Sequence, residues 1–208
     1  MNNPVAISYE LRRIVFSRKY LYLALLLGFV TYNGLTGDLT YGVYGTPPFS
    51  RLSYAKFLVS TSPFLLVFLI TLCGGVFSER EISTRNIIFS TPITTRGYFG
   101  LKSAAITGAF LLVASVLIAT SFAFIGWQFR YFRFHEYLHP ICVFLVPPLL
   151  FGFGLAMAAG RISGKLVYGI LPALFAMGIL NVDLPVWIDL CGNNFLTNLS
   201  KVVFRSLG

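Results

Sequence analysis

The chain has 208 residues, of which 56% are hydrophobic and only 11% are charged. Soluble domains carry about a quarter charged residues, so this composition excludes an ordinary soluble domain and predicts an all-α integral membrane protein. The formal net charge of +9 does not indicate nucleic-acid binding, because membrane proteins concentrate Lys and Arg in their cytoplasmic segments. We therefore expect a single transmembrane domain over residues 1–208, surrounded by the lipid bilayer and binding no nucleic acid.

The first segment, residues 4–19, has the pattern of an amphipathic helix. Its apolar and polar side chains fall on two different helical faces: Ile7, Leu11, Ile14 and Val15 against Glu10, Arg13 and Ser17. Such a helix lies in the membrane interface, and we expect Leu11, Arg12, Arg13 and Ile14 to make its interfacial contacts. The alternative is a basic flank that only sets the membrane topology. No A-x-A-like cleavage site follows, so we expect the first apolar run to be retained as a span.

Five apolar runs approach the about 20 residues that a membrane-spanning helix needs. They are Tyr20–Gly37, Phe57–Ser78, Ser103–Phe129, Pro140–Gly160 and Leu166–Val182. The pair Pro147-Pro148 predicts a kink or a break in the fourth run. The tail, residues 183–208, contains no run of this length, and we expect it to be an extracytoplasmic re-entrant or interfacial segment.

The basic residues predict the orientation of these five spans. With the N-terminus in the cytoplasm, the cytoplasmic segments hold ten Lys and Arg residues and the outside loops hold four, leaving the tail aside. Because Lys and Arg are enriched on the cytoplasmic side, we expect a cytoplasmic N-terminus. We place the protein in the cell (plasma) membrane of a bacterium.

The loop between the second and third spans, residues 79–102, is polar and suited to short helices. Ser83 or Thr84 is a good N-cap for a first helix, and Pro92 ends it because the residue before a proline avoids helical conformation. Thr94 or Thr95 is expected to cap a second helix, which runs through Lys102 into the third span. A polar, helix-capable loop between two spans is typical of a docking site for a soluble partner.

This loop resembles the first cytoplasmic loop of type-2 ABC exporter permeases. The residues that carry the resemblance are Glu79-Arg80-Glu81-x-Ser83-Thr84, then Ser90-Thr91-Pro92, then Arg96 and Lys102. The leader, residues 4–19, is similar to the membrane-surface connecting helix of that family. Ser83 stands where the family usually has Gly, and the family normally has six spans where this chain has five.

The resemblance implies a transport subunit rather than an enzyme. Such a permease pairs with a second permease and with two cytosolic ATP-binding cassette subunits, which bind ATP and Mg; this chain is expected to hold no cofactor and has no phosphate-binding G-x-x-x-x-G-K-[ST] motif. The loop would be the coupling helix, and its docking residues would be Glu79, Arg80, Glu81, Thr84, Arg85, Pro92 and Arg96. Uncharged spans favour an amphipathic or apolar substrate, such as a peptide, a drug or a lipid-like molecule.

Two alternatives to a permease remain, one based on another motif and one on the same loop. His135-Glu136-x-x-His139 matches the H-E-x-x-H pattern of zinc metalloproteases, in which both His share a helical face. Pro140 follows directly, which disfavours a helical His139 and suits the first residue of the fourth span, so we expect no metal there. The pattern Glu79-x-Glu81 loosely resembles the acid pair of membrane prenyl-protein proteases, but we expect these acids in the loop and not buried. The second alternative is a non-transporting sensor or assembly subunit that uses the same loop.

Overall fold

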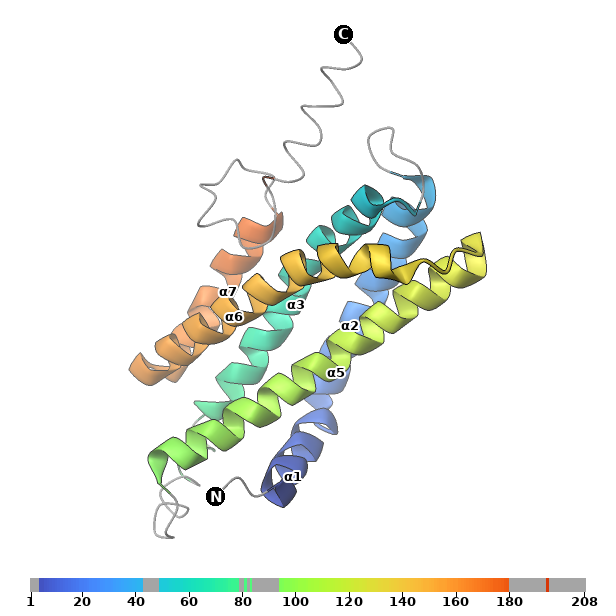
Figure 1. The fold of residues 1–208 in the computed structure, drawn as a ribbon. Coiled ribbons are helices and arrows are strands. Elements are labelled where there is room, and N and C mark those ends of the chain that lie inside the picture. Colours follow the sequence, from blue (N-terminus) through green and yellow to red (C-terminus); the bar gives the residue numbers. More distant parts are fainter. Residues whose placement is uncertain are drawn as a thin grey trace.

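The computed structural model describes residues 4–42, 49–78, 81, 83, 94–179 and 194, and every regular element within them is helical. Figure 1 shows these elements along the chain. Their bounds are α1 Pro4–Val15, α2 Arg18–Gly34, the π-helical η1 Leu35–Leu39, α3 Arg51–Val76, α5 Thr95–Phe129, the 3-10 helix η2 Phe134–Tyr137, α6 Leu138–Ile162 and α7 Gly164–Ile179.

Four helical segments are long and apolar enough to cross a membrane: Arg18–Leu39, Arg51–Val76, Thr95–Phe129 and Phe134–Ile162. They cover most of the first four predicted spans, which confirms an all-helical fold with four helices that could cross a membrane by length and composition. The predicted fifth span coincides with α7, whose 16 described residues are fewer than a crossing helix needs. The predicted tail, residues 183–208, lies outside the described residues except for Asn194.

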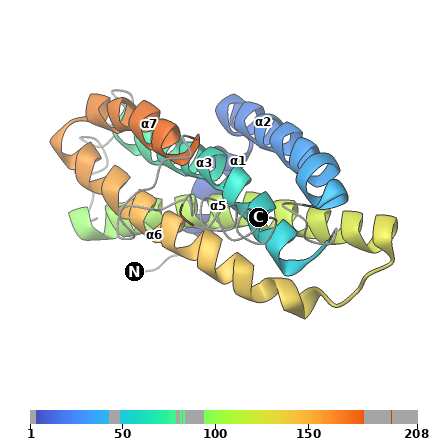
Figure 2. The same cartoon turned by 90° about the horizontal axis from the view of Figure 1, so that it is seen from above.

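Helix α3 is the centre of the bundle. In its most apolar stretch 72% of the residues are buried, against 39% or fewer in the other three long helices. It contacts α2, α5, α6 and α7, and the view in Figure 2 places α7, α3 and α2 in one row with α6 and α5 beside it. The outer faces of the surrounding helices keep large apolar side chains exposed, as lipid contact requires.

Polar side chains cap the helices that begin after loops. The hydroxyls of Ser17, Ser50 and Thr94 each accept a hydrogen bond of 3.2 Å from the backbone N–H three residues later. Each of these bonds satisfies one of the backbone donors that a helix start leaves unpaired. Thr94 is one of the two caps that the sequence predicts for the helix running into the third span, and α5 does run unbroken through Lys102.

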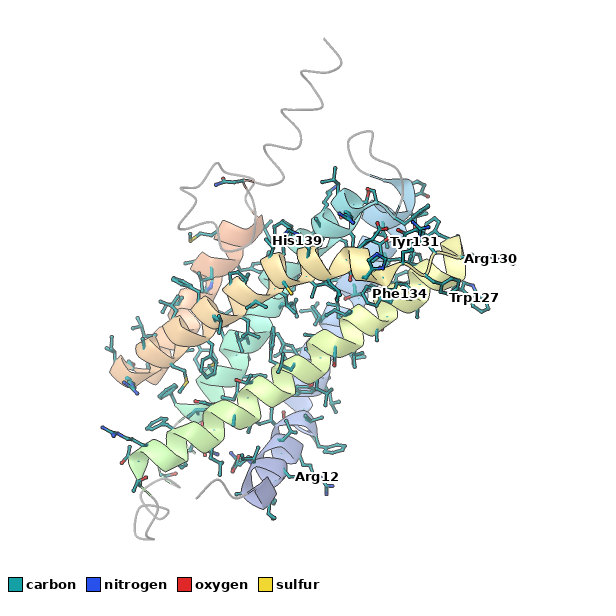
Figure 3. The ribbon with its side chains drawn as sticks, viewed as in Figure 1. Arg12, Trp127, Arg130, Tyr131, Phe134 and His139 are labelled. Carbon is teal, nitrogen blue, oxygen red and sulfur yellow. The ribbon has the colours of Figure 1, made fainter. Side chains whose placement is uncertain are left out.

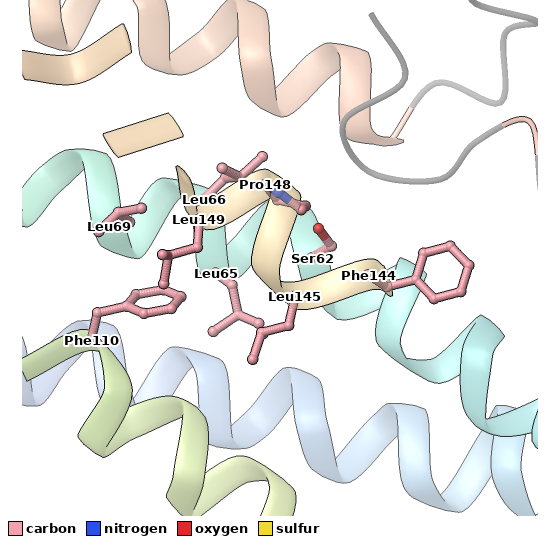
Figure 4. A pocket seen from close by; sticks show the side chains of 9 residues that line it. All are labelled: Ser62, Leu65, Leu66, Leu69, Phe110, Phe144, Leu145, Pro148 and Leu149. Carbon is pink, nitrogen blue, oxygen red and sulfur yellow. The ribbon is translucent and has the colours of Figure 1, made fainter. Parts of the chain in front are cut away.

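The prolines of α6 correct two predictions. The sequence predicts a kink or a break at Pro147-Pro148; a break is wrong, because α6 is continuous from Leu138 to Ile162, while a kink stays a prediction. Prolines are tolerated in membrane helices where neighbouring helices pack around them, and Pro148 is buried against α3 around a gap of only about 10 Å³ (Figure 4). His139 and Pro140 both lie in the first turn of α6, so the expectation of a non-helical His139 is also wrong. Proline is tolerated there because first-turn N–H groups have no acceptor within the helix.

The two ends of the bundle differ in charge. One end, called here the α1 end, carries α1 together with the last turn of α3, the first turns of α5 and the α6–α7 junction (Figure 1). The opposite end carries η1, the first turn of α3, the last turn of α5 and η2. Among the described residues, eight Lys and Arg lie toward the α1 end and four toward the opposite end. This distribution agrees with the predicted bias, while the orientation in a membrane stays a prediction.

Helix α1 is shorter than the predicted leader of residues 4–19, because Ser17 ends the segment and caps α2. Its predicted apolar residues, including Leu11 and Ile14, are half-buried, and the helix contacts α5. Arg12 points away from the bundle and is exposed (Figure 3). The amphipathic pattern is therefore used at least partly for packing within the protein; whether α1 also lies on a membrane surface stays a prediction.

Candidate functional site

Four charged side chains meet at the α1 end in one closed network. The Arg13 guanidinium Nη2 lies 3.0 Å from Glu10 Oε2 and 3.1 Å from Glu81 Oε2. The Lys102 Nζ lies 2.9 Å from Glu10 Oε2 and forms a further ion pair with Glu81 Oε1. Each cation thus bridges both carboxylates, and the two positive charges balance the two negative ones.

Tyr98 completes the network from α5. Its hydroxyl donates a hydrogen bond of 2.8 Å to Glu81 Oε1, and the Lys102 Nζ lies 5.5 Å from the centre of its ring. Tyr98 and Lys102 are four residues apart on one helix, which places them on the same face. Glu10 and Arg13 are three residues apart on α1, where neighbouring turns bring opposite charges together. The spacing within each helix therefore places Tyr98 beside Lys102 on α5 and Glu10 beside Arg13 on α1. These two pairs, together with Glu81, form the network.

Burial makes this network different from a surface ion pair. Lys102 is 3% exposed and Glu81 is 9% exposed. A charge taken out of water is tolerated only when partners replace its hydration, so removing one partner leaves the other with an uncompensated cost. The network consequently fixes Glu81 against α1 and α5.

The pKa of Glu81 reflects the same balance. Burial on its own raises this pKa, but hydrogen bonds from Lys102 and Tyr98, together with the charges of Lys102 and Arg13, outweigh it. The net result is a pKa below the ordinary value of a glutamate. Glu81 is therefore ionised at neutral pH, which is the state that the two cations require.

A second anchor holds the start of the same loop on its other side. Phe77, directly after α3, is buried against the α6–α7 junction. A Cβ atom placed on Gly160 would come within 2.1 Å of the Phe77 ring, and one on Gly164 within 2.4 Å of the Phe77 carbonyl oxygen. Both glycines are thus required for this close approach. The chain leaving α3 is held by α6 and α7 at Phe77 and by α1 and α5 at Glu81.

The structure brings only some of the predicted coupling residues together. Of the predicted coupling residues, Glu81 lies in the network and Arg96 is exposed in the first turn of α5. Of the residues predicted for the interfacial helix, Arg13 lies in the network and Arg12 is exposed on α1. The remaining predicted docking residues lie outside the described residues: Glu79, Arg80, Thr84, Arg85 and Pro92. The expectation that the loop acids are not buried is wrong for Glu81, whose partners come from helices distant in sequence.

Sequence reasoning assigned no role in an ion-pair network to Glu10, Tyr98 or Lys102. The sequence did indicate that Lys102 needs partners, because Lys102 stands next to the long apolar run Ser103–Phe129 and a buried cation needs partners of opposite charge. Tyr98 one turn earlier shares its face. What the sequence did not show is which acids Lys102 would meet.

The H-E-x-x-H segment lies at the opposite end of the bundle. His135 is in η2, His139 is in α6, and both are exposed; Figure 3 shows His139 apart from the labelled aromatic residues. The Glu136 carboxylate pairs with the Arg51 guanidinium at 3.5 Å. In the part of the chain that the structure describes, no three His, Cys, Asp or Glu residues gather as metal ligands would. Nothing in this geometry favours a zinc site.

The buried network at the α1 end is thus the feature from which a function is best argued. It joins three separate parts of the chain, one of them the loop singled out by its sequence motif.

A scan of protein-family models, a search of curated proteins and a search of solved structures each find no match to this chain.

Proposed function

We propose that this protein is the membrane-spanning permease subunit of an ATP-binding cassette exporter. The observation that carries the proposal is the buried network of Glu10, Arg13, Glu81 and Lys102, which ties the loop after α3 to two helices. A loop that receives force from a partner must be connected firmly to the helices that it moves. The resemblance of the sequence motif around Glu81 to the loop of exporter permeases indicates that the partner is an ATPase.

Helix α5 is suited to carry such a movement across the bilayer. It has 35 residues, which corresponds to about 52 Å at 1.5 Å per residue, while the hydrocarbon core is about 30 Å thick. The helix is therefore long enough for its first turns, with Tyr98 and Lys102, to extend beyond the hydrocarbon on the side of the loop. A displacement of Glu81 would be passed to α5 through Lys102 and Tyr98, and to α1 through Arg13.

The remaining parts of the proposal follow from the resemblance. Two cytosolic ATP-binding cassette subunits would bind ATP and Mg and dock on the exposed loop residues, among them Arg96. A second permease, identical or different, would complete the pathway. The passenger would be an amphipathic or apolar molecule, such as a peptide, a drug or a lipid-like compound. The N-terminus and the loop would face the cytoplasm of a bacterial cell.

The test is affinity purification of the tagged protein from its own host in detergent, with ATPase activity assayed in the eluate. We expect an ATP-binding cassette protein to co-elute, and Arg96→Glu to abolish its retention by reversing an exposed charge in the docking loop. Lys165→Glu is the matched control, because Lys165 is exposed at the same end of the bundle but in the α6–α7 junction. An eluate without ATPase, or equal loss in both variants, would contradict the proposal.

The same experiment separates the alternatives. Co-elution of a partner that lacks ATPase motifs would favour a sensor or assembly subunit that uses this loop. Stoichiometric zinc in the eluate, lost on His135→Ala, would favour a metalloprotease with His135, Glu136 and His139. We do not propose the protease, because its expected general base is already paired with Arg51.

A further inference from the structure

A cavity of about 520 Å³ lies beside the buried network, between α1, α2, α3 and α5. This volume is in the range of ligand-binding pockets in proteins. None of the roles discussed above uses the cavity. Its wall has a polar part and an apolar part. The chemistry of these two parts determines which class of ligand the cavity can bind.

The polar part carries a net positive charge. The four network residues contribute no net charge, and Lys19 lines the cavity in addition. Lys19 is exposed and stands in the first turn of α2, whose N-cap is Ser17. The side chain of Ser17 caps the N–H of Tyr20, whereas the N–H groups of Arg18 and Lys19 donate to no acceptor among the described residues. Free N–H groups at a helix start, together with a lysine, favour an anion.

The apolar part continues from the polar one into the bundle. It is lined by five aliphatic side chains: Ile14, Leu23, Leu72, Val76 and Ile106. Leu23 lies about 7.5 Å from the start of α2, and Leu72 about 6 Å before the end of α3, at 1.5 Å per residue. The cavity therefore reaches from the charged end of the bundle about one turn along the apolar helices α2 and α3.

We propose that this cavity binds an anionic amphiphile, with a phosphate or carboxylate head at Lys19 and the start of α2 and an aliphatic chain along Leu23 and Leu72. A membrane lipid of the leaflet next to α1 has this chemistry. A free anion would use only the polar part, and a neutral lipid only the apolar part. The proposal does not depend on the partner ATPase, so it can be tested on the isolated protein.

Two variants test the two parts of the cavity. Gly75 lines the cavity, and a Cβ atom placed there has no neighbour within 4 Å, so Gly75→Leu fills the space without a clash at its first atom. Gly100→Leu is its control, because Gly100 is equally open but is not part of the cavity wall. Lys19→Gln removes the positive charge of the lysine that lines the cavity. Arg18→Gln is its control, because it removes a neighbouring positive charge that is not part of the cavity wall.

The measurement is native mass spectrometry of the detergent-purified protein with phosphatidylglycerol or with phosphatidylcholine of the same acyl chains. We expect about fivefold tighter binding of phosphatidylglycerol. Gly75→Leu should remove most of the binding of that lipid and Lys19→Gln most of the preference, while both controls stay within about twofold of wild type, as changes outside the site should. Thermal unfolding in the same detergent verifies that each variant is folded.

Three results would overturn the proposal. Equal binding of the two lipids would remove the anion preference, and unchanged binding in Gly75→Leu would place the lipid elsewhere. Displacement of the bound lipid by inorganic phosphate at millimolar concentration would show that the polar part binds a free anion and that the chain contributes nothing.

Discussion

The two ends of this bundle use similar charged residues in different ways. At the opposite end, Lys56 pairs with Asp38 at 2.9 Å, and Arg51 pairs with Glu136 with side chains 65% and 24% exposed. At the α1 end, Lys102 and Glu81 have side chains 4% and 11% exposed and share their partners. Ion pairs that stay partly exposed contribute less to stability than a buried shared network, which fixes the elements that supply it. The comparison locates the rigid connection of the molecule at the α1 end.

The largest expected effect comes from removing the most buried cation. Lys102→Met leaves Glu10 and Glu81 with Arg13 as their only cation among the described residues, and we expect a loss of about 3 kcal/mol in the free energy of unfolding. Lys56→Met removes a partly exposed lysine at the opposite end and should cost less than about 1 kcal/mol. SDS-driven unfolding in mixed micelles measures both. Equal losses would mean that the two ends do not differ in the way described.

The Phe77 anchor is tested by filling the space that Phe77 occupies. Gly160→Ala places a Cβ within 2.1 Å of the Phe77 ring, and we expect it to destabilise the protein by about 2 kcal/mol through overpacking. Gly154→Ala in the same helix meets nothing within 4 Å and should be neutral or stabilising by up to about 1 kcal/mol. The same unfolding assay compares them, and a harmless Gly160→Ala would show that the loop start is loosely held.

The pH dependence of stability tests the charge state of the network. The pKa of Glu81 is lowered in the folded protein, so its contribution to stability is fully present above the unfolded-state pKa. That contribution is lost as the pH falls through the lower folded-state pKa. Thermal unfolding between neutral pH and pH 3 should therefore show an acid loss that is smaller in Glu81→Gln. An acid loss as large in Glu81→Gln as in the wild type would contradict the assignment to Glu81.

The smallest effect is expected for the histidines. Both are exposed, so we expect His135→Ala combined with His139→Ala to change the free energy of unfolding by less than about 0.5 kcal/mol. Elemental analysis of the purified wild type should find no stoichiometric zinc. Bound zinc that is lost in the double variant would assign a function to the opposite end that the present comparison does not.

Four of the five predicted spans coincide with long apolar helices, because hydropathy depends on contiguous residues. The cap at Thr94 could be predicted because a cap depends on a few adjacent residues. The continuity of α6 could not be predicted, because the local preference of Pro147-Pro148 against helix is overridden by packing on α3. The ion-pair network could not be predicted either, because Arg13 and Glu81 are 68 residues apart and Glu10 and Lys102 are 92 residues apart. The sequence motif singled out Glu81 as a docking residue, which stays a prediction, but it did not predict that Glu81 is buried.

A double-mutant cycle between Glu81 and Lys102 tests the central claim most directly. The free energy of unfolding is measured for wild type, Glu81→Gln, Lys102→Met and the double variant under identical conditions. If the buried network ties the loop to α5, the two substitutions are coupled by at least about 1.5 kcal/mol, as expected for residues in one ion-pair network. Additive effects of the two substitutions would show that Glu81 and α5 are not energetically connected, and would contradict the account.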